Sequence, residues 1–237
     1  MITLYCYGPV GPLTDFSPYC AKVVMWLDMA GLPYRRTFMP PSRSPNKKLP
    51  AVKDDGSLMV ESTQIIAALD EKYKTHLDGF LTQEQRAQCT VIHKLLDTRL
   101  YDLAVRARWK EQSEWDHQSK ALDEFLDHAR VPRLARPMVR YFARRSAVAQ
   151  VNARPVGQMS ADAYEAESHS VLKEVDRLVN VDRFVFGDSP CSMDATLAAF
   201  IEASIEHPPA GAFHQAANGY PALRTYLTRF KEHIHNA

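Results

Sequence analysis

Two hydrophobic patterns divide the chain at about residue 78, and this change limits the folds that it can adopt. Before the change, short apolar runs alternate with helical periodicity; after it, helical periodicity punctuated by Gly and Pro continues almost to the end. The chain has 237 residues, 46% of them hydrophobic, so it can bury two modest cores. The patterns predict a mixed α/β domain over residues 1–77 and an all-helical domain over residues 82–237.

The first 77 residues predict a definite order of elements. A right-handed crossover makes the first two expected strands parallel, whereas Asp54-Asp55-Gly56 favours a hairpin turn that makes the last two antiparallel. The resulting order, strand-helix-strand and then strand-strand-helix, matches a thioredoxin-like domain. The expected strands cover residues 2–7, 34–38, 51–53 and 58–60, and the expected helices follow Ser17 and Glu61.

The second part of the chain carries signals for helices only. Its first long helix is expected to begin at Thr82, because Thr82 and Gln85 have the spacing of a capping box, in which each side chain satisfies the other residue's backbone donor. Later helices are expected over residues 115–128, 132–150, 160–179, 192–206 and 221–234.

Charge and cysteine content argue against several classes of function. The 29 basic and 28 acidic residues nearly cancel, so composition provides no long-range field that would attract nucleic acid or an anionic membrane. Cys6, Cys20, Cys89 and Cys191 lack the close spacing of a zinc site or a C-x-x-C redox motif, so no metal is expected. A reducing cytosol is the simplest explanation for four scattered cysteines. The sequence has neither the pattern of a signal peptide nor an apolar run of membrane-spanning length.

One segment gathers positive charge next to apolar side chains. Six arginines lie between residues 130 and 145, among Met138, Val139, Tyr141 and Phe142. The segment could contact an anionic partner or a membrane. We interpret it instead as a solvated helical face, because its apolar residues can point into the helical bundle.

The motif Ser17-Pro18-Tyr19-Cys20 follows the first expected strand and opens the first expected helix. Thioredoxin-fold proteins keep reactive sulfur or hydroxyl chemistry at this place, although Ser and Pro also start helices for capping reasons alone. Two further signals follow in order: Lys48-Leu49-Pro50 before the third strand, and Glu61-Ser62-Thr63 before the second helix. The three landmarks together favour a functional site.

With these landmarks in place, the sequence resembles the soluble glutathione transferases over essentially its whole length. Residues 17–23 and 29–34, together with Lys48-Leu49-Pro50, are most similar to the branch that also contains failed-axon-connections and metaxin-like proteins. The resemblance implies the glutathione transferase architecture, an α/β thioredoxin-like N-terminal domain plus an all-α C-terminal domain. It also implies glutathione as a co-substrate.

The resemblance implies that Ser17 is the catalytic residue. A cysteine thiol has a pKa of about 8.5, so the glutathione thiol is mostly protonated at neutral pH. A hydroxyl at a helix start can donate a hydrogen bond to the sulfur, and the helix dipole also favours the thiolate. Tyr7, at the end of the first strand, is the rival hydroxyl. Cys20 begins the apolar face of its helix and is expected to be a buried structural thiol.

The other two landmarks imply the glutathione-binding residues. Pro50 occupies the place of the family's cis-proline, where the Leu49 backbone can pair with the cysteinyl moiety. Lys48 suits the glycyl carboxylate, and a solvated surface lysine is an even alternative. Ser62 and the first backbone donors of its helix suit the γ-glutamyl carboxylate, and Glu61 suits the ammonium group. An ordinary cap beside a surface acid is the alternative for this last pair.

The resemblance also places a second substrate across the domain cleft, against the first long helix. Tyr101, Arg108 and Trp109, with Tyr7, are the candidate contacts. An aromatic ring near a cation suits an electrophile that bears a carboxylate or nitro group. The alternatives are a core position for Trp109 and an ion pair for Arg108.

Residues 186–195 resemble the helix-start motif of the family, with Asp194 in the acidic position of the first turn. Cys191 stands where a Ser or Thr cap is usual, and its thiol is a weaker hydrogen-bond acceptor. Asp194 is therefore expected to serve folding rather than catalysis, by satisfying backbone donors at a buried helix start.

The function implied by the resemblance is that of a cytoplasmic glutathione transferase-like enzyme, which promotes attack of the glutathione thiolate on a small electrophile. The alternative is a noncatalytic glutathione-binding or scaffold protein of the failed-axon-connections or metaxin type. A third function, glutathione-dependent thiol reduction through Cys20, is disfavoured because Ser17 replaces the leading cysteine. A homodimer is compatible with the family, whereas nucleic acid and a membrane span are not expected.

Overall fold

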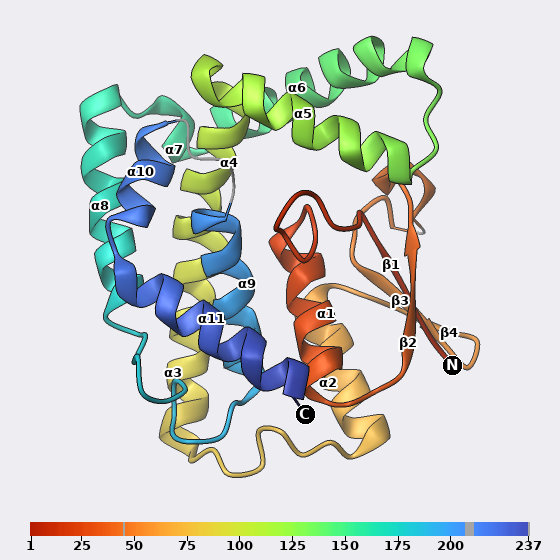
Figure 1. The fold of residues 1–237 in the computed structure, drawn as a ribbon, viewed down its shortest axis with the longest axis vertical. Coiled ribbons are helices and arrows are strands. Elements are labelled where there is room, and N and C mark those ends of the chain that lie inside the picture. The colour runs from red at the N-terminus through yellow and green to blue at the C-terminus, as the bar shows by residue number, and fades with distance from the viewer. Residues whose placement is uncertain (45, 207–210, 237) are drawn as a thin grey trace.

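The computed structural model describes residues 1–44, 46–206 and 211–236 of the chain (Figure 1). Its strands form one mixed sheet in the order β2-β1-β3-β4. β2 runs parallel to β1, whereas β3 is antiparallel to both β1 and β4. The predicted parallel pair and hairpin are thus confirmed. The strands are β1 (Ile2–Cys6), β2 (Tyr34–Phe38), β3 (Ala51–Asp54) and β4 (Ser57–Val60).

Helix α1 (Pro18–Met29) is buried on nearly all sides because it lies between the sheet and the helical part of the molecule (Figure 1). The Trp26 indole donates a hydrogen bond to Ser192 Oγ at 3.0 Å, which joins α1 to the start of α9 (Ser192–Ile205). Helix α2 (Ser62–Tyr73) also packs against α1 and completes the predicted thioredoxin-like order. Helix α1 therefore packs against the sheet on one side and against the helical part of the molecule on the other.

Helices dominate the described part of the chain after residue 82, which confirms the predicted fold class. The capping box at the start of α3 forms as predicted, since Gln85 N donates to Thr82 Oγ1 at 3.2 Å and Thr82 N donates to Gln85 Oε1 at 2.9 Å. The helices other than α9 are α3 (Gln83–Lys94), α4 (Tyr101–Lys110), α5 (Gln112–His128), α6 (Arg136–Asn152), α7 (Pro155–Gln158), α8 (Ala161–Asp176), α10 (Ala212–Asn218) and α11 (Pro221–Asn236).

The helical part differs from the sequence prediction in several places. A π-helical turn, Leu95–Leu100, separates α3 from α4. Helix α6 begins at Arg136 rather than at Pro132, because residues 133–135 form a separate 3₁₀ turn. Helices α7 and α10 were not predicted, and α5 begins at Gln112 rather than at Trp115. Hydrophobic periodicity does not reveal a single π-helical turn or a helix of one or two turns, because each shifts the spacing of apolar residues by only one or two positions.

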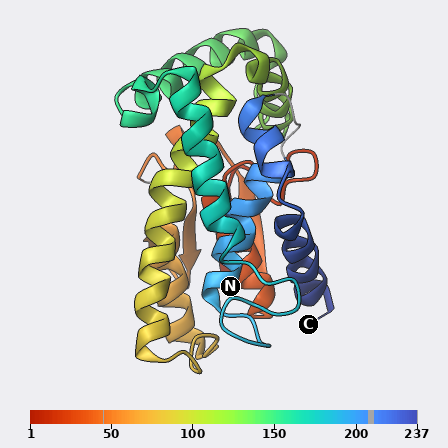
Figure 2. The ribbon, with the colours of Figure 1, turned by 90° about the vertical axis from the view of Figure 1, so that its left-hand side faces the viewer.

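Helices α5 and α6 form an antiparallel pair that reaches from the helical bundle across the end of the sheet (Figures 1 and 2). Several contacts attach the pair to the loop after β1. Gly11 N donates to Glu124 Oε2 at 2.8 Å, and the rings of Tyr7 and Phe125 meet edge to face with centroids 5.2 Å apart. The pair thereby covers the region where the first strand leads toward α1.

The expectation that the apolar residues of the arginine-rich segment point into the bundle is wrong for most of them. Met138, Tyr141 and Phe142 of α6 are 65%, 59% and 58% exposed, whereas Val139 packs against the core beneath α5. The reason is that α6 forms an outer layer of the α5–α6 pair, so one of its faces has no further helix to pack against (Figure 2).

A buried carboxylate holds the start of α9. Asp194 accepts hydrogen bonds from Val185 N and Cys191 N, both at 2.9 Å, and from the Tyr226 hydroxyl at 2.5 Å. Its side chain is fully buried. The predicted folding role of Asp194 is confirmed, and the structure adds Val185 and Tyr226 as partners from outside the helix start.

The connection between α2 and α3 runs from residue 74 to residue 82. The predicted domain boundary, with domains over 1–77 and 82–237, falls in this connection and stays a prediction. No helix within the described ranges is long and apolar enough to cross a membrane.

Candidate functional site

A cavity of about 680 Å³ lies where the sheet, α1 and α2 meet the helical part of the molecule. The structure brings most of the predicted site residues together here, although they come from the loop after β1, the segment before β3, two helix starts and α4. Those that line it are Tyr7, Ser17, Lys48, Leu49, Pro50, Glu61, Ser62 and Tyr101. Among the lining residues that the sequence did not single out are Tyr19, Asp97, Ser146, Gln150 and Arg154.

Ser17 is the N-cap residue of α1, but its side chain does not act as a cap. Its backbone is extended, at φ −108° and ψ 128°, and its hydroxyl accepts no hydrogen bond from the first turn of the helix. Pro18 follows at the first helical position, where its missing N–H leaves one fewer unpaired backbone donor at the helix start. Ser17 lines the cavity instead, and a hydrogen bond from its side chain acts against the burial that raises the pKa of the Cys20 thiol.

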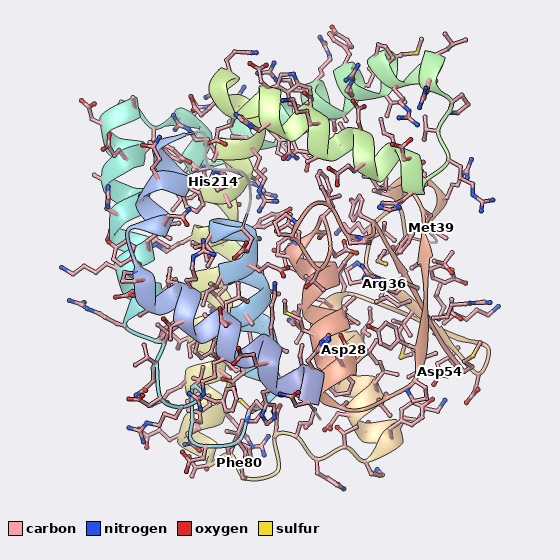
Figure 3. All side chains as sticks on the ribbon, in the orientation of Figure 1. Asp28, Arg36, Met39, Asp54, Phe80 and His214 are labelled. Atoms are coloured by element: carbon pink, nitrogen blue, oxygen red, sulfur yellow. The ribbon has the colours of Figure 1, made fainter. Side chains whose placement is uncertain are left out.

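Asp15 holds the backbone that positions Ser17. Its buried carboxylate accepts hydrogen bonds from Gly8 N at 2.8 Å, Ser17 N at 3.1 Å and Arg36 Nη2 at 2.8 Å. Arg36 belongs to β2 (Figure 3) and also donates to Thr14 O. Burial raises the pKa of Asp15 to about 6, although the Arg36 charge and the two backbone donors act in the opposite direction. The carboxylate thus ties both ends of the loop between β1 and α1 to the sheet.

Tyr7 and Cys20 are both held in their neutral forms by burial. The Tyr7 ring lies between Phe16 and Phe125, and burial raises the pKa of its hydroxyl well above the ordinary value. Burial likewise raises the pKa of the Cys20 thiol, which is 0% exposed. The expectation of a buried structural thiol at Cys20 is confirmed, and a protonated Tyr7 can act only as a hydrogen-bond donor or acceptor.

The opposite wall of the cavity is formed by the start of α2 and the segment before β3. Ser62 is the first residue of α2 and is buried, so the donors of the first helical turn lie at the cavity. Glu61 precedes it with φ +65°, a left-handed conformation that is uncommon for a residue other than glycine. Lys48 Nζ lies 3.7 Å from Glu61 Oε1, and both side chains are exposed. The Leu49–Pro50 peptide bond is cis.

Asp97 adds a carboxylate that the sequence reasoning missed. It lies in the π-helical turn between α3 and α4, where one extra residue per turn changes which side chains face the cavity. Asp97 Oδ1 is buried and has no hydrogen-bond partner among the described residues. Burial raises the pKa of Asp97, whereas the nearby charge of Lys22 lowers it. A buried carboxylate oxygen without a donor suits a ligand that brings an N–H group.

Arg108 and Trp109 do not line the cavity, so the structure does not bring them to the predicted second-substrate position. Arg108 is buried and donates from Nη2 to the Ala203 carbonyl of α9 at 3.2 Å. Trp109 packs against Trp115 with ring centroids 5.8 Å apart. Arg108 lies two turns beyond Tyr101 on the same face of α4, and α9 covers that face at its level.

A thioredoxin-like sheet whose two helix starts line a cavity beside a helical bundle is the architecture of the glutathione transferases. Residues 18–115 match the family model of the glutathione S-transferase N-terminal domain. The β-etherase LigF from Sphingobium sp. strain SYK-6 has the same fold, with a TM-score of 0.58 at 18% identity, and the match covers 100% of this chain and 99% of that chain.

Two relatives match over nearly the whole of this chain. The isoprene-epoxide–glutathione S-transferase of Rhodococcus sp. (strain AD45) is 26% identical over 238 residues, covering 98% of both proteins. Failed axon connections of Drosophila melanogaster is 28% identical over 236 residues, covering 96% of this chain but 54% of that protein. The chain therefore spans about half the length of this second relative. These findings confirm the predicted resemblance to glutathione transferases and to Failed axon connections.

Proposed function

We propose that the chain is a glutathione transferase-like enzyme, which binds glutathione in the 680 Å³ cavity and promotes attack of its thiolate on a small electrophile. One observation carries the proposal: Ser17 does not cap α1 with its side chain and lines the same cavity as Lys48, Leu49 and Ser62. The similarity to an isoprene-epoxide–glutathione S-transferase supports an enzymatic role.

The cavity offers a complementary group for each part of the tripeptide. The donors at the start of α2 and the Ser62 hydroxyl would bind the γ-glutamyl carboxylate. Glu61 would bind the ammonium group, while Leu49 pairs its backbone with the cysteinyl moiety. Lys48 would meet the glycyl carboxylate, since its only ion pair within the described ranges is the long contact to Glu61. In this assignment, residues 1–77 form the glutathione-binding domain.

The chemistry requires stabilisation of the glutathione thiolate at neutral pH. Its thiol, with a pKa of about 8.5, loses its proton to solvent through the open cavity. The Ser17 hydroxyl then donates a hydrogen bond to the sulfur, and the positive end of the α1 dipole favours the negative charge. The sulfur attacks the electrophilic carbon, a carbon–sulfur bond forms, and the displaced atom leaves with the bonding electron pair.

Ser17→Ala tests this assignment against Tyr7. Calorimetric titration with glutathione should give a dissociation constant within about threefold of the wild type, while kcat for conjugation falls about 100-fold because one donor to the sulfur is lost. Tyr7→Phe is the matched control, since it also removes a single hydroxyl from the cavity wall, and it should keep most of the activity. A large loss in Tyr7→Phe with little loss in Ser17→Ala would exchange the two roles.

A noncatalytic glutathione-binding or scaffold protein is the second candidate, favoured by the similarity to Failed axon connections. Such a protein would bind glutathione in the calorimeter but would conjugate none of a panel of electrophiles. Conjugation by the wild type above the uncatalysed rate, and its loss in Ser17→Ala, would exclude this candidate. Homodimer formation and a cytosolic location stay predictions of the family resemblance.

A further inference from the structure

The stretch over residues 129–160 carries a local charge that the balanced total conceals. Seven of the 29 basic residues lie in this stretch, all of them arginine, and none of the 28 acidic residues does. The stretch covers the connection after α5, helix α6 and helix α7, up to the start of α8. Helix α6 and its flanking turns therefore concentrate positive charge, while the rest of the chain is acidic overall.

Part of this charge is not compensated by the protein. Arg136 and Arg140 form ion pairs with acids of α5. Arg130 and Arg145, by contrast, are exposed and form no ion pair with any residue that the structure describes. Their charges are therefore available to an anionic surface outside the molecule.

The outer side of α6 is apolar between these arginines. Leu134, Met138 and Phe142 are spaced four residues apart, which places them along one side of the helix and of the turn before it. Leu134 is 98% exposed, and the other two are also exposed. Tyr141 is exposed beside them, and its ring meets that of Phe142 edge to face with centroids 5.4 Å apart. We call these four side chains the α6 face. Large apolar side chains that gather in this way mark an interaction surface.

A pocket of about 820 Å³ lies next to the α6 face. Tyr141 belongs to both, and the pocket is also lined by Lys110, Arg140, Arg144 and Arg145. No acidic residue of the described chain lines it. An anionic group bound beside the α6 face would therefore meet several cations.

This combination favours a lipid surface over other anionic partners. Nucleic acid would pair with the arginines but would leave the apolar α6 face in water. A second copy of the chain would bring two arginine-rich helices together, and like charges repel. An interfacial amphipathic helix, in contrast, places its apolar side among the acyl chains and keeps its arginines at the headgroups. The α5–α6 pair lies at one end of the molecule, where such a surface can reach it (Figures 1 and 2).

We propose that the α6 face docks the protein on the surface of an anionic membrane, with its four apolar side chains in the interface and the neighbouring arginines at the lipid headgroups. Docking of this kind needs no membrane-spanning helix, and none occurs among the described residues. The proposal is independent of the chemistry in the glutathione cavity, because binding to lipid is measured without substrate.

Co-sedimentation of the full chain with lipid vesicles tests the proposal. Vesicles of phosphatidylcholine with about 30% phosphatidylserine should bind the wild type at low salt, and vesicles of phosphatidylcholine alone should bind it at least about tenfold less. Raising NaCl to about 0.5 M should weaken binding to the anionic vesicles about tenfold, because salt screens the arginine charges.

Two double variants separate the apolar contribution from the charge contribution. Leu134→Ser with Phe142→Ser should lower the partition coefficient on anionic vesicles about tenfold or more, since two exposed apolar side chains are lost. Arg130→Gln with Arg145→Gln should lower it by a similar factor at low salt, but should have little effect at about 0.5 M NaCl.

The matched controls lie elsewhere on the surface. Val91→Ser removes an exposed apolar side chain of α3, and Arg35→Gln removes an exposed cation of β2. Both should bind the anionic vesicles as the wild type does. Because every substituted side chain is exposed, thermal unfolding should be unchanged in all of these variants.

Three results would overturn the proposal. Failure of the wild type to bind anionic vesicles would leave an acidic protein as the occupant of the α6 face. An equal loss of binding in the controls and in the α6 variants would place the lipid contact elsewhere. A dimer in light scattering that Leu134→Ser with Phe142→Ser dissociates would assign the α6 face to a second copy of the chain.

Discussion

The starts of α1 and α9 solve the same physical problem in opposite ways. At α9, the buried Asp194 takes hydrogen bonds from two backbone donors and from Tyr226, so the polar groups there are used in folding. At α1, the Ser17 side chain makes no cap bond and faces a cavity. A helix start is therefore a candidate binding site where no side chain caps its first turn and it lines a cavity.

The start of α3 provides a third case that separates burial from pairing. The polar groups of Thr82 and Gln85 are paired in a complete capping box, just as those around Asp194 are paired. The capping box, however, lies on an exposed surface. Water can replace the lost bonds there. The three helix starts should consequently respond differently to loss of one side chain, and four measurements, described from the largest effect to the smallest, test this comparison.

Asp194→Ala should cause the largest change. It leaves Val185 N, Cys191 N and the Tyr226 hydroxyl without their acceptor in a buried place, and each unsatisfied group costs about 1–3 kcal/mol. The free energy of unfolding should therefore fall by about 3 kcal/mol or more. Urea unfolding followed by circular dichroism measures this change, and a loss below 1 kcal/mol would show that water satisfies these donors.

Ser17→Ala should separate activity from stability. Because the hydroxyl makes no cap bond, the free energy of unfolding should change by less than about 0.5 kcal/mol. Conjugation should fall about 100-fold, equivalent to about 2.7 kcal/mol of transition-state stabilisation. The same urea titration and a conjugation assay are run on one preparation. A destabilisation of 1 kcal/mol or more would instead make Ser17 an ordinary cap.

Lys22 of α1 should give the protein a pH-dependent stability. It is buried, donates to Thr63 Oγ1 at 2.8 Å, and burial lowers its pKa to about 8. Between this value and the ordinary lysine pKa of about 10.4, the unfolded chain binds more protons than the folded chain, so the Lys22 contribution to unfolding free energy rises with pH. The wild type should gain about 1 kcal/mol over Lys22→Met between pH 8 and 9.

The matched control for this measurement is Lys53→Met, because Lys53 is exposed on β3. The free energy of unfolding of Lys53→Met should change with pH in the same way as that of the wild type over this range. A constant difference between the wild type and Lys22→Met from pH 7.5 to 9.5 would mean that Lys22 keeps an ordinary pKa in the folded protein.

Thr82→Ala should have the smallest effect. Loss of an exposed cap costs about 0.5–1 kcal/mol, since water replaces part of the bond to Gln85 N. Thermal unfolding should show a small shift, and Gln85→Ala should show a similar one because it breaks the reciprocal bond. A loss as large as that of Asp194→Ala would remove burial as the explanation of the difference between the two helix starts.

Much of the fold was predictable because it rests on local signals. Alternation of apolar residues, the Asp54-Asp55-Gly56 turn and the Thr82 capping box each act within a few residues, and the structure contains all three elements that they predict. The π-helical turn at Leu95–Leu100 was not predictable in this way, since it changes the pattern by a single residue. That turn places Asp97 at the cavity.

The site residues likewise divide into those that local motifs predicted and those that depend on distant packing. The resemblance to glutathione transferases led to Ser17, Lys48 and Ser62 because each lies in a short motif. Asp15 was missed, because it lies in a loop and its partner Arg36 is 21 residues away on β2. Arg108 was placed wrongly for a similar reason, since only the packing of α9 decides that its guanidinium meets a carbonyl instead of a substrate.

By itself, the sequence determined the order of strands and helices, the three landmarks and the helix starts, because hydrophobic periodicity, turn chemistry and capping act over a few neighbouring residues. Only the tertiary structure decided which helix start remains open to a ligand and which walls enclose it. Asp15 with Arg36, Asp97 with its π-helical turn, and Gln150 of α6 meet Ser17 only when segments distant in the sequence pack together, and no local pattern encodes that packing.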